Sequence, residues 1–330
     1  MATGGTGVGS SVILLTGAAG FIGSHVAEAL LARGDTVVGV DNFDPYYDLA
    51  LKRTNLASVT KVGGARFENI EADICDGDAM RAVFERIKPA GVIHLAAKAG
   101  VRPSIADPAG YSRTNVLGTS VLMDEARRAG VGRLVMASSS SVYGNQRKTP
   151  FSEDDDVSCP ISPYAATKRA CELLAHTHWH LTGMPTACLR FFTVFGERQR
   201  PDLAIMHFMR AIAAGQTIRM FGSGSTSRDY TYVGDIVRGV LAAYDRVHEQ
   251  GYRVWNLGHS EPVTLSDMIA TISRVVGKDA KVDHKPAQPG DVETTFADLA
   301  RSGKELGYRP QVSFEEGVRR QWAWVRGATG

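Results

Sequence analysis

The sequence is poor in cysteine, has no long hydrophobic run and carries little net charge. Its four cysteines form no C-x-x-C pair, which favours buried thiols in a reducing compartment over disulfides or a zinc site. No apolar run approaches the roughly 18 to 20 residues that cross a membrane, and no signal-like segment opens the chain. The formal charge of +2 is spread along the sequence, which is not typical of a nucleic-acid or anionic-membrane surface. We therefore expect a cytoplasmic protein with no nucleic-acid or membrane partner and no metal.

The 330 residues exceed one ordinary core, so we expect a large domain and a smaller one. Patterns typical of strands alternate with helical patterns up to about residue 200, and this rhythm then weakens. The sequence thus predicts an α/β fold, a doubly wound (Rossmann) parallel sheet with a smaller mixed α/β carboxyl-terminal lobe. The expected boundaries are 12–195 for the sheet domain, to which some later segments return, and 196–330 for the lobe. The Gly/Ser/Thr-rich residues 1–11 are expected to form a flexible tail.

The stretch from Val12 to Asp41 has the pattern strand, glycine turn, helix, strand. Gly17, Gly20 and Gly23 fall on G-x-x-G-x-x-G, which lets backbone amides approach a pyrophosphate at the start of the helix. Asp41 ends the second strand, where a carboxylate accepts hydrogen bonds from an adenosine ribose and repels a 2′-phosphate. The stretch therefore predicts a site for NAD rather than NADP.

A second group of residues has catalytic chemistry. Tyr164 and Lys168 stand four residues apart and share a helix face, where the lysine cation stabilises a tyrosine phenolate. By itself this pair is more typical of an exposed helix surface. The serine run 138–141, which follows an apolar strand, adds a hydroxyl that can hold the oxygen deprotonated by the tyrosine. Together with the glycine turn, these residues predict a dehydrogenase-like active site.

Three histidines suggest a metal site at first sight. His176 and His180 share a helix face, with His178 between them. The glutamate of H-E-x-x-H is missing, so the pattern favours a helix-surface or dimer-interface role over metal binding.

The combination of the glycine turn, Asp41, Ser139 and Tyr164-x-x-x-Lys168 resembles the extended short-chain dehydrogenase/reductase family, the NAD-dependent nucleotide-sugar epimerases and dehydratases. The similarity covers almost the whole chain. Further similar stretches are 41–43 with 46–47, 99–102, 189–196 with 200–202, 228–233 and 288–292. Many relatives, including UDP-galactose 4-epimerases, have Asn where Thr193 stands. Thr193 followed by Arg200-Pro201-Asp202 is similar to the UDP-glucuronate 4-epimerase subgroup.

The resemblance implies an activity and partners. The expected reaction is reversible C4 epimerisation of UDP-glucuronate to UDP-galacturonate through a transient 4-keto intermediate, with NAD reduced and reoxidised in place. Domain 12–195 would bind NAD, and 196–330 would bind most of the UDP-sugar. Helices at 115–129 and 164–181 would pair across a homodimer.

The resemblance also assigns roles by position. The implied catalytic residues are Tyr164, Lys168 and Ser139. The implied cofactor-binding residues are Gly17, Gly20, Phe21, Ile22, Gly23, Asp41, Asn42, Asp73, Ile74, Leu95, Ala96, Ala97, Lys98, Asn115, Ser138, Tyr164 and Lys168. The implied substrate-binding residues are Arg102, Ser139, Arg200, Arg228 and Asp291, although Arg200 equally fits a solvated basic loop. Related epimerases often have an Arg just before the last Gly-Asp, where this chain has Gln288-Pro289, so the UDP contacts stay open.

The expected intermediate poses a chemical problem, because its C6 carboxylate lies β to a ketone and is lost easily as CO2. The carboxylate must be held, yet the sugar must also turn over to receive its hydride on the opposite face. We therefore expect small hydroxyls, such as Ser140, Ser141 or Thr193, rather than a rigid bidentate arginine.

Three other functions fit parts of the pattern. A UDP-glucose/UDP-galactose 4-epimerase, or an enzyme of dual specificity, shares all of this chemistry. A nucleotide-sugar decarboxylase or dehydratase starts from the same keto intermediate. A non-enzymatic NAD-binding regulator needs no Tyr164 and Lys168, so the intact pair argues against it.

Overall fold

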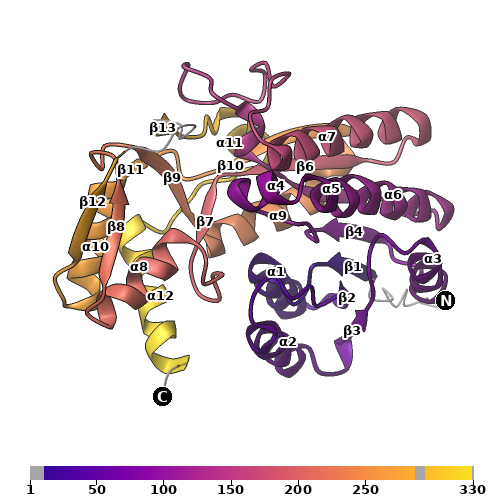
Figure 1. Ribbon diagram of the computed structural model, residues 1–330. Coiled ribbons are helices and arrows are strands. Elements are labelled where there is room, and N and C mark those ends of the chain that lie inside the picture. Colours follow the sequence, from indigo (N-terminus) through magenta and orange to yellow (C-terminus); the bar gives the residue numbers. More distant parts are fainter. Residues whose placement is uncertain (1–10, 287–293, 329–330) are drawn as a thin grey trace, which may run out of the picture.

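The computed structural model describes residues 11–286 and 294–328 (Figure 1). Most of the predicted tail and the predicted substrate residue Asp291, with Gln288-Pro289, lie outside the described residues. No helix within the described ranges is both long and apolar enough to cross a membrane.

A seven-stranded parallel sheet forms the centre of the molecule, in the order β10-β6-β5-β4-β1-β2-β3. Its strands are β1 Val12–Thr16, β2 Thr36–Asp41, β3 Phe67–Glu71, β4 Gly91–His94, β5 Leu134–Ser139, β6 Thr186–Phe191 and β10 Tyr252–Leu257. The order reverses between β1 and β4, and ligands of doubly wound sheets bind at such a switch point. The predicted fold class is confirmed.

Helices cover both faces of the sheet because its strands are apolar on both sides. Ile13 and Leu15 pack toward α1, α2 and α9, whereas Leu14 between them packs toward α3, α6 and α7. The bounds of these helices are α1 Phe21–Arg33, α2 Leu49–Gly63, α9 Val233–Arg246, α3 Gly77–Ile87, α6 Gly118–Arg128 and α7 Pro163–Thr182. Figure 1 shows α7 and α6 side by side along one side of the sheet.

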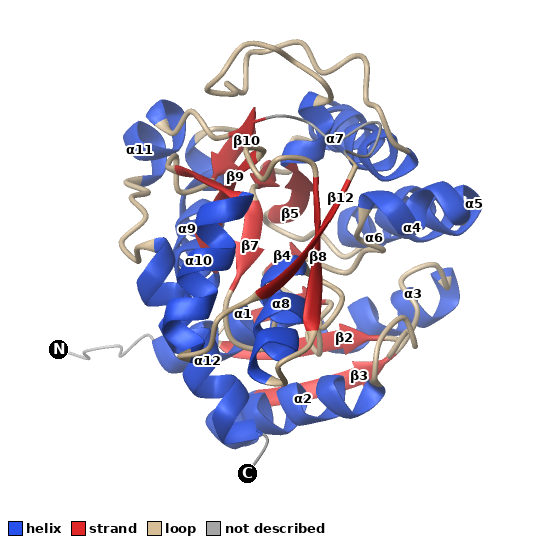
Figure 2. Ribbon diagram, turned by 60° about the vertical axis from the view of Figure 1, so that its left-hand side comes forward, coloured by secondary structure: helices blue, strands red, loops and turns tan. Residues whose placement is uncertain are grey.

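The carboxyl-terminal lobe lies beside the large sheet, to its left in Figure 1, and consists of short strands and helices (Figure 2). Its strands are β7 Thr193–Phe195, β8 Thr217–Phe221, β9 Ser227–Tyr232, β11 Pro262–Thr264, β12 Lys281–Lys285 and β13 Thr294–Thr295. Its helices are α8 Ala204–Ala213, α10 Leu265–Val276, α11 Ala300–Leu306 and α12 Phe314–Ala328. β10 is the edge strand of the large sheet and α9 packs on that sheet, so both lie with it although they follow residue 196 in the chain. The boundary at 195/196 itself stays a prediction.

The structure corrects two predicted elements. The helix expected from residue 115 begins at Pro108, where Asp107 caps α5 (Pro108–Tyr111), and it continues through a π-helical turn, Ser112–Leu117, into α6. The alternating pattern of residues 186–195 predicts one continuous strand, but the structure interrupts it at Phe192, so that β7 leaves the large sheet and pairs with β9 of the lobe. A short helix, α4 (Val101–Ala106), has no counterpart in the prediction.

Candidate active site

A cavity of about 500 Å³ lies at the carboxyl ends of the central strands, beside the lobe. This volume is in the range of ordinary small-molecule sites. Most of the residues predicted from the sequence line it, although they come from distant parts of the chain. They are Gly17, Gly20, Phe21, Ile22, Gly23, Asp41, Asn42, Ile74, Leu95, Ala96, Ala97, Lys98, Ser138, Ser139, Ser140, Ser141, Tyr164, Lys168, Thr193 and Arg200.

The glycine turn between β1 and α1 leaves room for a dinucleotide. Gly17 has φ +75°, and a Cβ there would lie 2.8 Å from the Ala96 nitrogen. A Cβ on Gly23 would lie 2.0 Å from the Gly17 oxygen, so only glycine lets the turn press on the helix. A Cβ added at Gly20 would have one heavy atom of the described residues within 4 Å, the Gly17 oxygen, apart from the residues next to Gly20 in the chain. Since this helix start has no side-chain cap in the described residues, its amides fit the diphosphate of NAD.

Asp41 stands at the end of β2, where its carboxylate is buried and held in place. Its oxygens accept hydrogen bonds from the amides of Ala19 (3.2 Å) and Phe43 (2.9 Å). The Lys52 ammonium of α2 lies 3.4 Å from the same carboxylate. The carboxylate thus borders the cavity in a fixed orientation, as a ribose contact requires.

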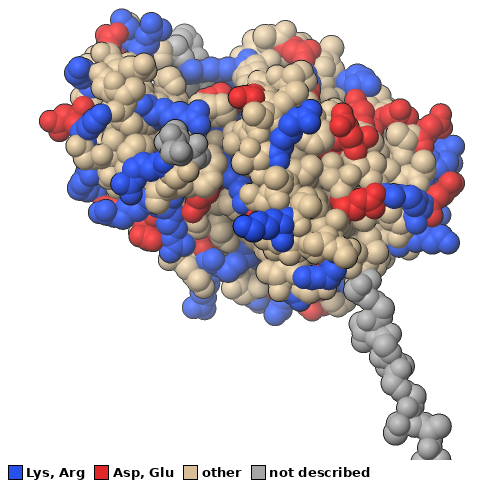
Figure 3. Space-filling model, turned by 90° about the horizontal axis from the view of Figure 1, so that it is seen from below, with Lys and Arg blue, Asp and Glu red and all other residues tan. Residues whose placement is uncertain are grey.

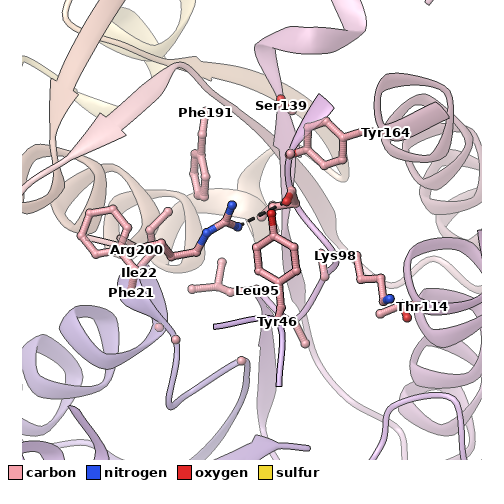
Figure 4. Close-up of a pocket in the computed structure, with 18 of the residues that line it drawn as sticks. Phe21, Ile22, Tyr46, Leu95, Lys98, Thr114, Ser139, Tyr164, Phe191 and Arg200 are labelled. Carbon is pink, nitrogen blue, oxygen red and sulfur yellow. Dashed lines mark hydrogen bonds between the residues drawn. The ribbon is translucent and has the colours of Figure 1, made fainter. Parts of the chain in front are cut away.

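Tyr164 and Lys168 project from the first turns of α7, which begins at the Ser162 cap with Pro163 as its first residue. The Lys168 ammonium donates a hydrogen bond of 2.8 Å to the Ala137 carbonyl of β5, which anchors it beneath the cavity. The Tyr164 ring packs edge-on against Tyr111, with 6.2 Å between ring centres. Figure 4 shows Tyr164, Ser139 and Arg200 around the same space.

A buried ion pair lies behind the serine run. Ser138 donates a hydrogen bond of 2.6 Å to Glu172, which accepts two further bonds from Arg190 at 2.8 and 2.9 Å. Burial opposes ionisation of Glu172, but the Arg190 guanidinium prevails and holds the pKa of this carboxyl below its usual range. Because the Ser138 hydroxyl donates its O–H to Glu172, its oxygen can make any further hydrogen bond only as an acceptor.

His94 ends β4 and fixes the neighbouring wall of the cavity. Its Nδ1 lies 2.7 Å from the Thr16 hydroxyl and its Nε2 lies 3.0 Å from the Thr119 hydroxyl. The Thr16 oxygen also accepts a hydrogen bond from the Ala96 amide at 3.2 Å. Burial, with the charge of Lys168 as a second cause, lowers the pKa of His94 to about 3.

This lowered pKa predicts a stability effect in acid. In the unfolded chain His94 gains its proton below about pH 6.5, whereas in the folded protein it stays neutral down to about pH 3, so stability is lost as the pH falls through this window. From about pH 7 to about pH 5, the free energy of unfolding should fall by about 2 kcal/mol more in the native protein than in His94→Gln. Urea unfolding of both proteins at the two pH values measures the difference, and equal losses would contradict the prediction.

Arg200 lies in the cavity wall but is already bound on three sides. Its Nε and Nη2 donate to Asp202 at 3.0 and 2.7 Å, and its Nη1 donates to the Ala99 carbonyl at 3.3 Å. Its guanidinium also lies 5.0 Å from the centre of the Tyr46 ring. Arg200 thus stands in the cavity wall, and its role as a substrate-binding residue stays a prediction.

The loop that carries Arg200 connects the lobe to the glycine-turn helix. Arg198 donates to Glu28 of α1 at 2.7 Å, and the Glu197 carbonyl lies 3.0 Å from Nε2 of His25 on the same helix. The Glu197 carboxylate accepts hydrogen bonds from Tyr232 of β9 at 2.9 and 3.0 Å. These contacts fix the lobe against the helix that borders the cavity.

Among the described residues, four of the predicted site residues do not line this cavity, and their binding roles stay predictions. Asp73 turns instead to the Cys75 amide and to Arg113, and Arg102 is exposed at the start of α4. Arg228 lies outside the cavity on β9, where it donates to the Ser227 carbonyl. The Asn115 amide is buried behind the wall and pairs with both backbone groups of Lys98 at 2.8 and 3.0 Å, so it positions a cavity residue rather than touching the cavity.

The cavity also includes residues that the sequence reasoning did not assign to the site. They are Val40, Asp44, Tyr46, Tyr47, Lys52, Ala72, Ala99, Gly100, Val101, Tyr111, Thr114, Ala137, Phe191, Phe192, Val194 and Leu203. Tyr46 and Tyr47 stand in a stretch that is similar to the family, and this similarity could have assigned them to the site. Lys52 is one polar residue of an amphipathic helix, and nothing in its local pattern sets it apart.

Of the three histidines of α7, His176 and His180 are exposed and His178 is half-buried. The His176 ring packs edge-on against Tyr252, with 5.1 Å between ring centres. Over residues 11–286 and 294–328, no group of three or more His, Cys, Asp or Glu side chains is placed to hold a metal ion. The dimer-interface alternative stays a prediction.

Comparisons with known proteins agree with this geometry. The family model described as GDP-mannose 4,6 dehydratase matches residues 14–321. The UDP-glucuronate 4-epimerase of Thermodesulfobacterium geofontis is 41% identical over 314 residues, which cover 95% of this chain and 95% of that protein.

Solved structures are similar over almost their whole length. The UDP-glucuronic acid 4-epimerase from Bacillus cereus, in complex with UDP-glucuronic acid and NAD, has a TM-score of 0.89 at 34% identity, covering 96% of this chain and 99% of that one. The UDP-glucose 4-epimerase of Thermus thermophilus in complex with NAD has a TM-score of 0.86 at 30% identity, with the same coverage. This chain therefore belongs to the extended short-chain dehydrogenase/reductase family of NAD-dependent nucleotide-sugar epimerases and dehydratases.

Proposed function

We propose that this chain, an NAD-dependent nucleotide-sugar 4-epimerase, interconverts UDP-glucuronate and UDP-galacturonate. The observation that carries the proposal is the meeting of two groups of residues in one cavity. Tyr164, Lys168 and Ser139 lie there together with the hydroxyls of Ser140, Ser141 and Thr193. The first group suits oxidation at C4, and the second suits a C6 carboxylate. We also propose that 12–195 binds the cofactor and 196–330 most of the UDP-sugar.

Tyr164 is the proposed base that takes the proton of the 4-hydroxyl. Lys168, anchored on the Ala137 carbonyl, supplies the cation that favours the phenolate, and Ser139 holds the substrate oxygen. NAD, when bound, supplies the hydride acceptor and donor for C4. After the sugar has turned over, Tyr164 returns the proton to the oxygen of the opposite epimer.

Small hydroxyls are the proposed holders of the C6 carboxylate. Arg200 supports this assignment because each of its three guanidinium nitrogens already donates a hydrogen bond, to Asp202 or to the Ala99 carbonyl. The C5–C6 bond breaks readily only when it is aligned with the π system of the C4 ketone. Hydroxyls that keep this bond near the carbonyl plane would suppress loss of CO2, and they release the carboxylate more easily than a bidentate arginine.

Incubation with UDP-glucuronate and, separately, with UDP-glucose tests the proposal, with products resolved by NMR. UDP-galacturonate should form faster than UDP-galactose. Faster conversion of UDP-glucose would instead favour a UDP-glucose 4-epimerase. The hydroxyls of Ser140, Ser141 and Thr193 support this alternative too, because they also suit the neutral C6 CH2OH group of UDP-glucose. A product that has lost CO2 or water would indicate a decarboxylase or dehydratase.

Replacing Thr193 with Ala should change the outcome of the reaction. Loss of its hydroxyl lets the C5–C6 bond of the carboxylate leave the carbonyl plane, so the yield of a UDP-pentose by-product should rise. Alternatively, the preference for UDP-glucuronate over UDP-glucose should fall by about tenfold, the usual effect of losing one hydrogen bond. Product analysis by NMR measures both. Thr60→Ala is the control, because Thr60 is exposed and its hydroxyl donates to the Leu56 carbonyl of its own helix. If Thr193→Ala alters neither quantity, other groups hold the carboxylate.

We also propose a homodimer formed through α7 and the helix that leads into α6. Leu117, Leu173 and Leu181 are large apolar side chains with exposed fractions of 47%, 54% and 76% on these helices. Burial against a second copy would remove this apolar surface from water. Sedimentation should then give twice the chain mass of 35.5 kDa.

A further inference from the structure

Lys52 is a buried cation in the part of the cavity where the cofactor's ribose is expected. It lies in the first turn of α2, and only 7% of the residue is exposed. It lines the cavity together with Asp41 and Tyr47. Its Nζ is 3.4 Å from Oδ1 of Asp41 and 5.3 Å from the centre of the Tyr47 ring. A lysine is seldom buried without a charge partner, and here the partner is the residue expected to select NAD.

This pairing changes the electrostatics of cofactor selection. A lone carboxylate repels a 2′-phosphate, but a carboxylate and an ammonium in contact have no net charge. The amides of Ala19 and Phe43 also hold Asp41 in place. Within the described residues, Lys52 is the only charged partner of Asp41 at salt-bridge distance. The discrimination against a phosphate is therefore weaker than Asp41 alone would give.

We propose that Lys52 is a second specificity residue and a latent binding group for a 2′-phosphate. While Asp41 is ionised, Lys52 offsets its charge. Without that charge, the ammonium is a desolvated cation with three donors at the cavity wall, and a phosphate dianion is its natural ligand. The inference rests on the proposed dinucleotide site but not on which sugar is the substrate.

Two other charged residues, Arg53 and Asp44, lie near Lys52 in the chain. Arg53 follows Lys52 in the helix but is exposed and outside the cavity, with its guanidinium 5.8 Å from the centre of the Phe43 ring. Asp44 lines the cavity further along the loop, where it accepts a hydrogen bond from the Tyr46 amide at 2.9 Å. Lys52 is thus the cation in contact with Asp41, and Arg53 is a matched control for loss of positive charge from α2.

The test measures which dinucleotide the purified protein holds, without a substrate. The native protein and its variants are equilibrated with equal concentrations of NAD and NADP and freed of unbound nucleotide. The bound nucleotides are then released by denaturation and quantified. In Asp41→Asn the ratio of bound NADP to NAD should rise by about 10- to 100-fold, the worth of a charge-assisted hydrogen bond. Adding Lys52→Met should abolish most of this rise, whereas adding Lys52→Arg or Arg53→Met should preserve it.

The outcomes separate this inference from the proposed function. If Asp41→Asn leaves the ratio unchanged, or if the rise persists after Lys52→Met, Lys52 is not the phosphate-binding group and the inference fails. If the native protein holds neither nucleotide, the proposed cofactor site itself is wrong. Circular dichroism identifies a variant that has not folded, and Lys52→Gln then replaces Lys52→Met in the same comparison.

Discussion

Tyr164→Phe is expected to lower the turnover of UDP-glucuronate by about 10²- to 10⁴-fold, the usual effect of removing a positioned proton acceptor. The ring, its edge-on contact with Tyr111 and the α7 backbone all remain, so the variant should keep its fold and its bound NAD. Initial rates of UDP-galacturonate formation measure the loss, and release of nucleotide from the denatured protein measures the cofactor.

Tyr111→Phe is the matched control for this loss. Tyr111 lines the same cavity, and its hydroxyl donates to the Ala99 carbonyl at 3.1 Å rather than standing free for a substrate. Its removal should cost about tenfold at most, the worth of one hydrogen bond. Near-normal turnover of Tyr164→Phe, or equal losses in the two variants, would assign the base to another residue.

Gly23→Ala is expected to reduce the affinity for NAD by up to about 100-fold, since overpacking typically costs about 1 to 3 kcal/mol. The added Cβ would lie 2.0 Å from the Gly17 backbone oxygen, which belongs to the turn itself and cannot rotate away as a side chain does. The turn and the start of α1 must therefore separate, and their amides lose the arrangement that suits a diphosphate. Titration with NAD, followed by calorimetry or fluorescence, gives the affinity.

Gly77→Ala provides the comparison, because Gly77 also stands in the first turn of a helix, α3. Apart from its chain neighbours and the nearby backbone of its own helix, no heavy atom of the described residues lies within 4 Å of its added Cβ. This variant should bind NAD as the native protein does. Unchanged affinity in Gly23→Ala would show that the close approach of turn and helix is not what forms the site.

The buried groups behind the cavity show why sequence motifs alone do not make the site. The Glu172–Arg190 pair fixes Ser138, the Thr16–His94–Thr119 contacts fix the Ala96 amide, and Asn115 fixes Lys98. Except for His94, which stands two residues before Ala96, these supporting residues come from strands and helices that do not lead into the residue they position. The cavity therefore depends on the packing of the whole sheet domain.

The sequence by itself determined the features that depend on near neighbours in the chain. The spacing of Gly17, Gly20 and Gly23 after an apolar run predicts the turn, because strand, turn and helix follow one another directly. The four-residue spacing of Tyr164 and Lys168 predicts a shared helix face, since the period of a helix is local. Alternating strands and helices predicted the doubly wound sheet, which the structure confirms.

Only the tertiary structure decided which distant residues meet. Thr193 was predicted at the end of one long strand, but pairing with Tyr230 of β9 draws it out of the large sheet. Asp73 and Arg228 carry family-like signals yet do not reach the cavity, whereas Lys52, with no signal of its own, is placed by α2 against Asp41. Strand order and helix packing set these contacts, and they bury groups against partners that no local pattern identifies.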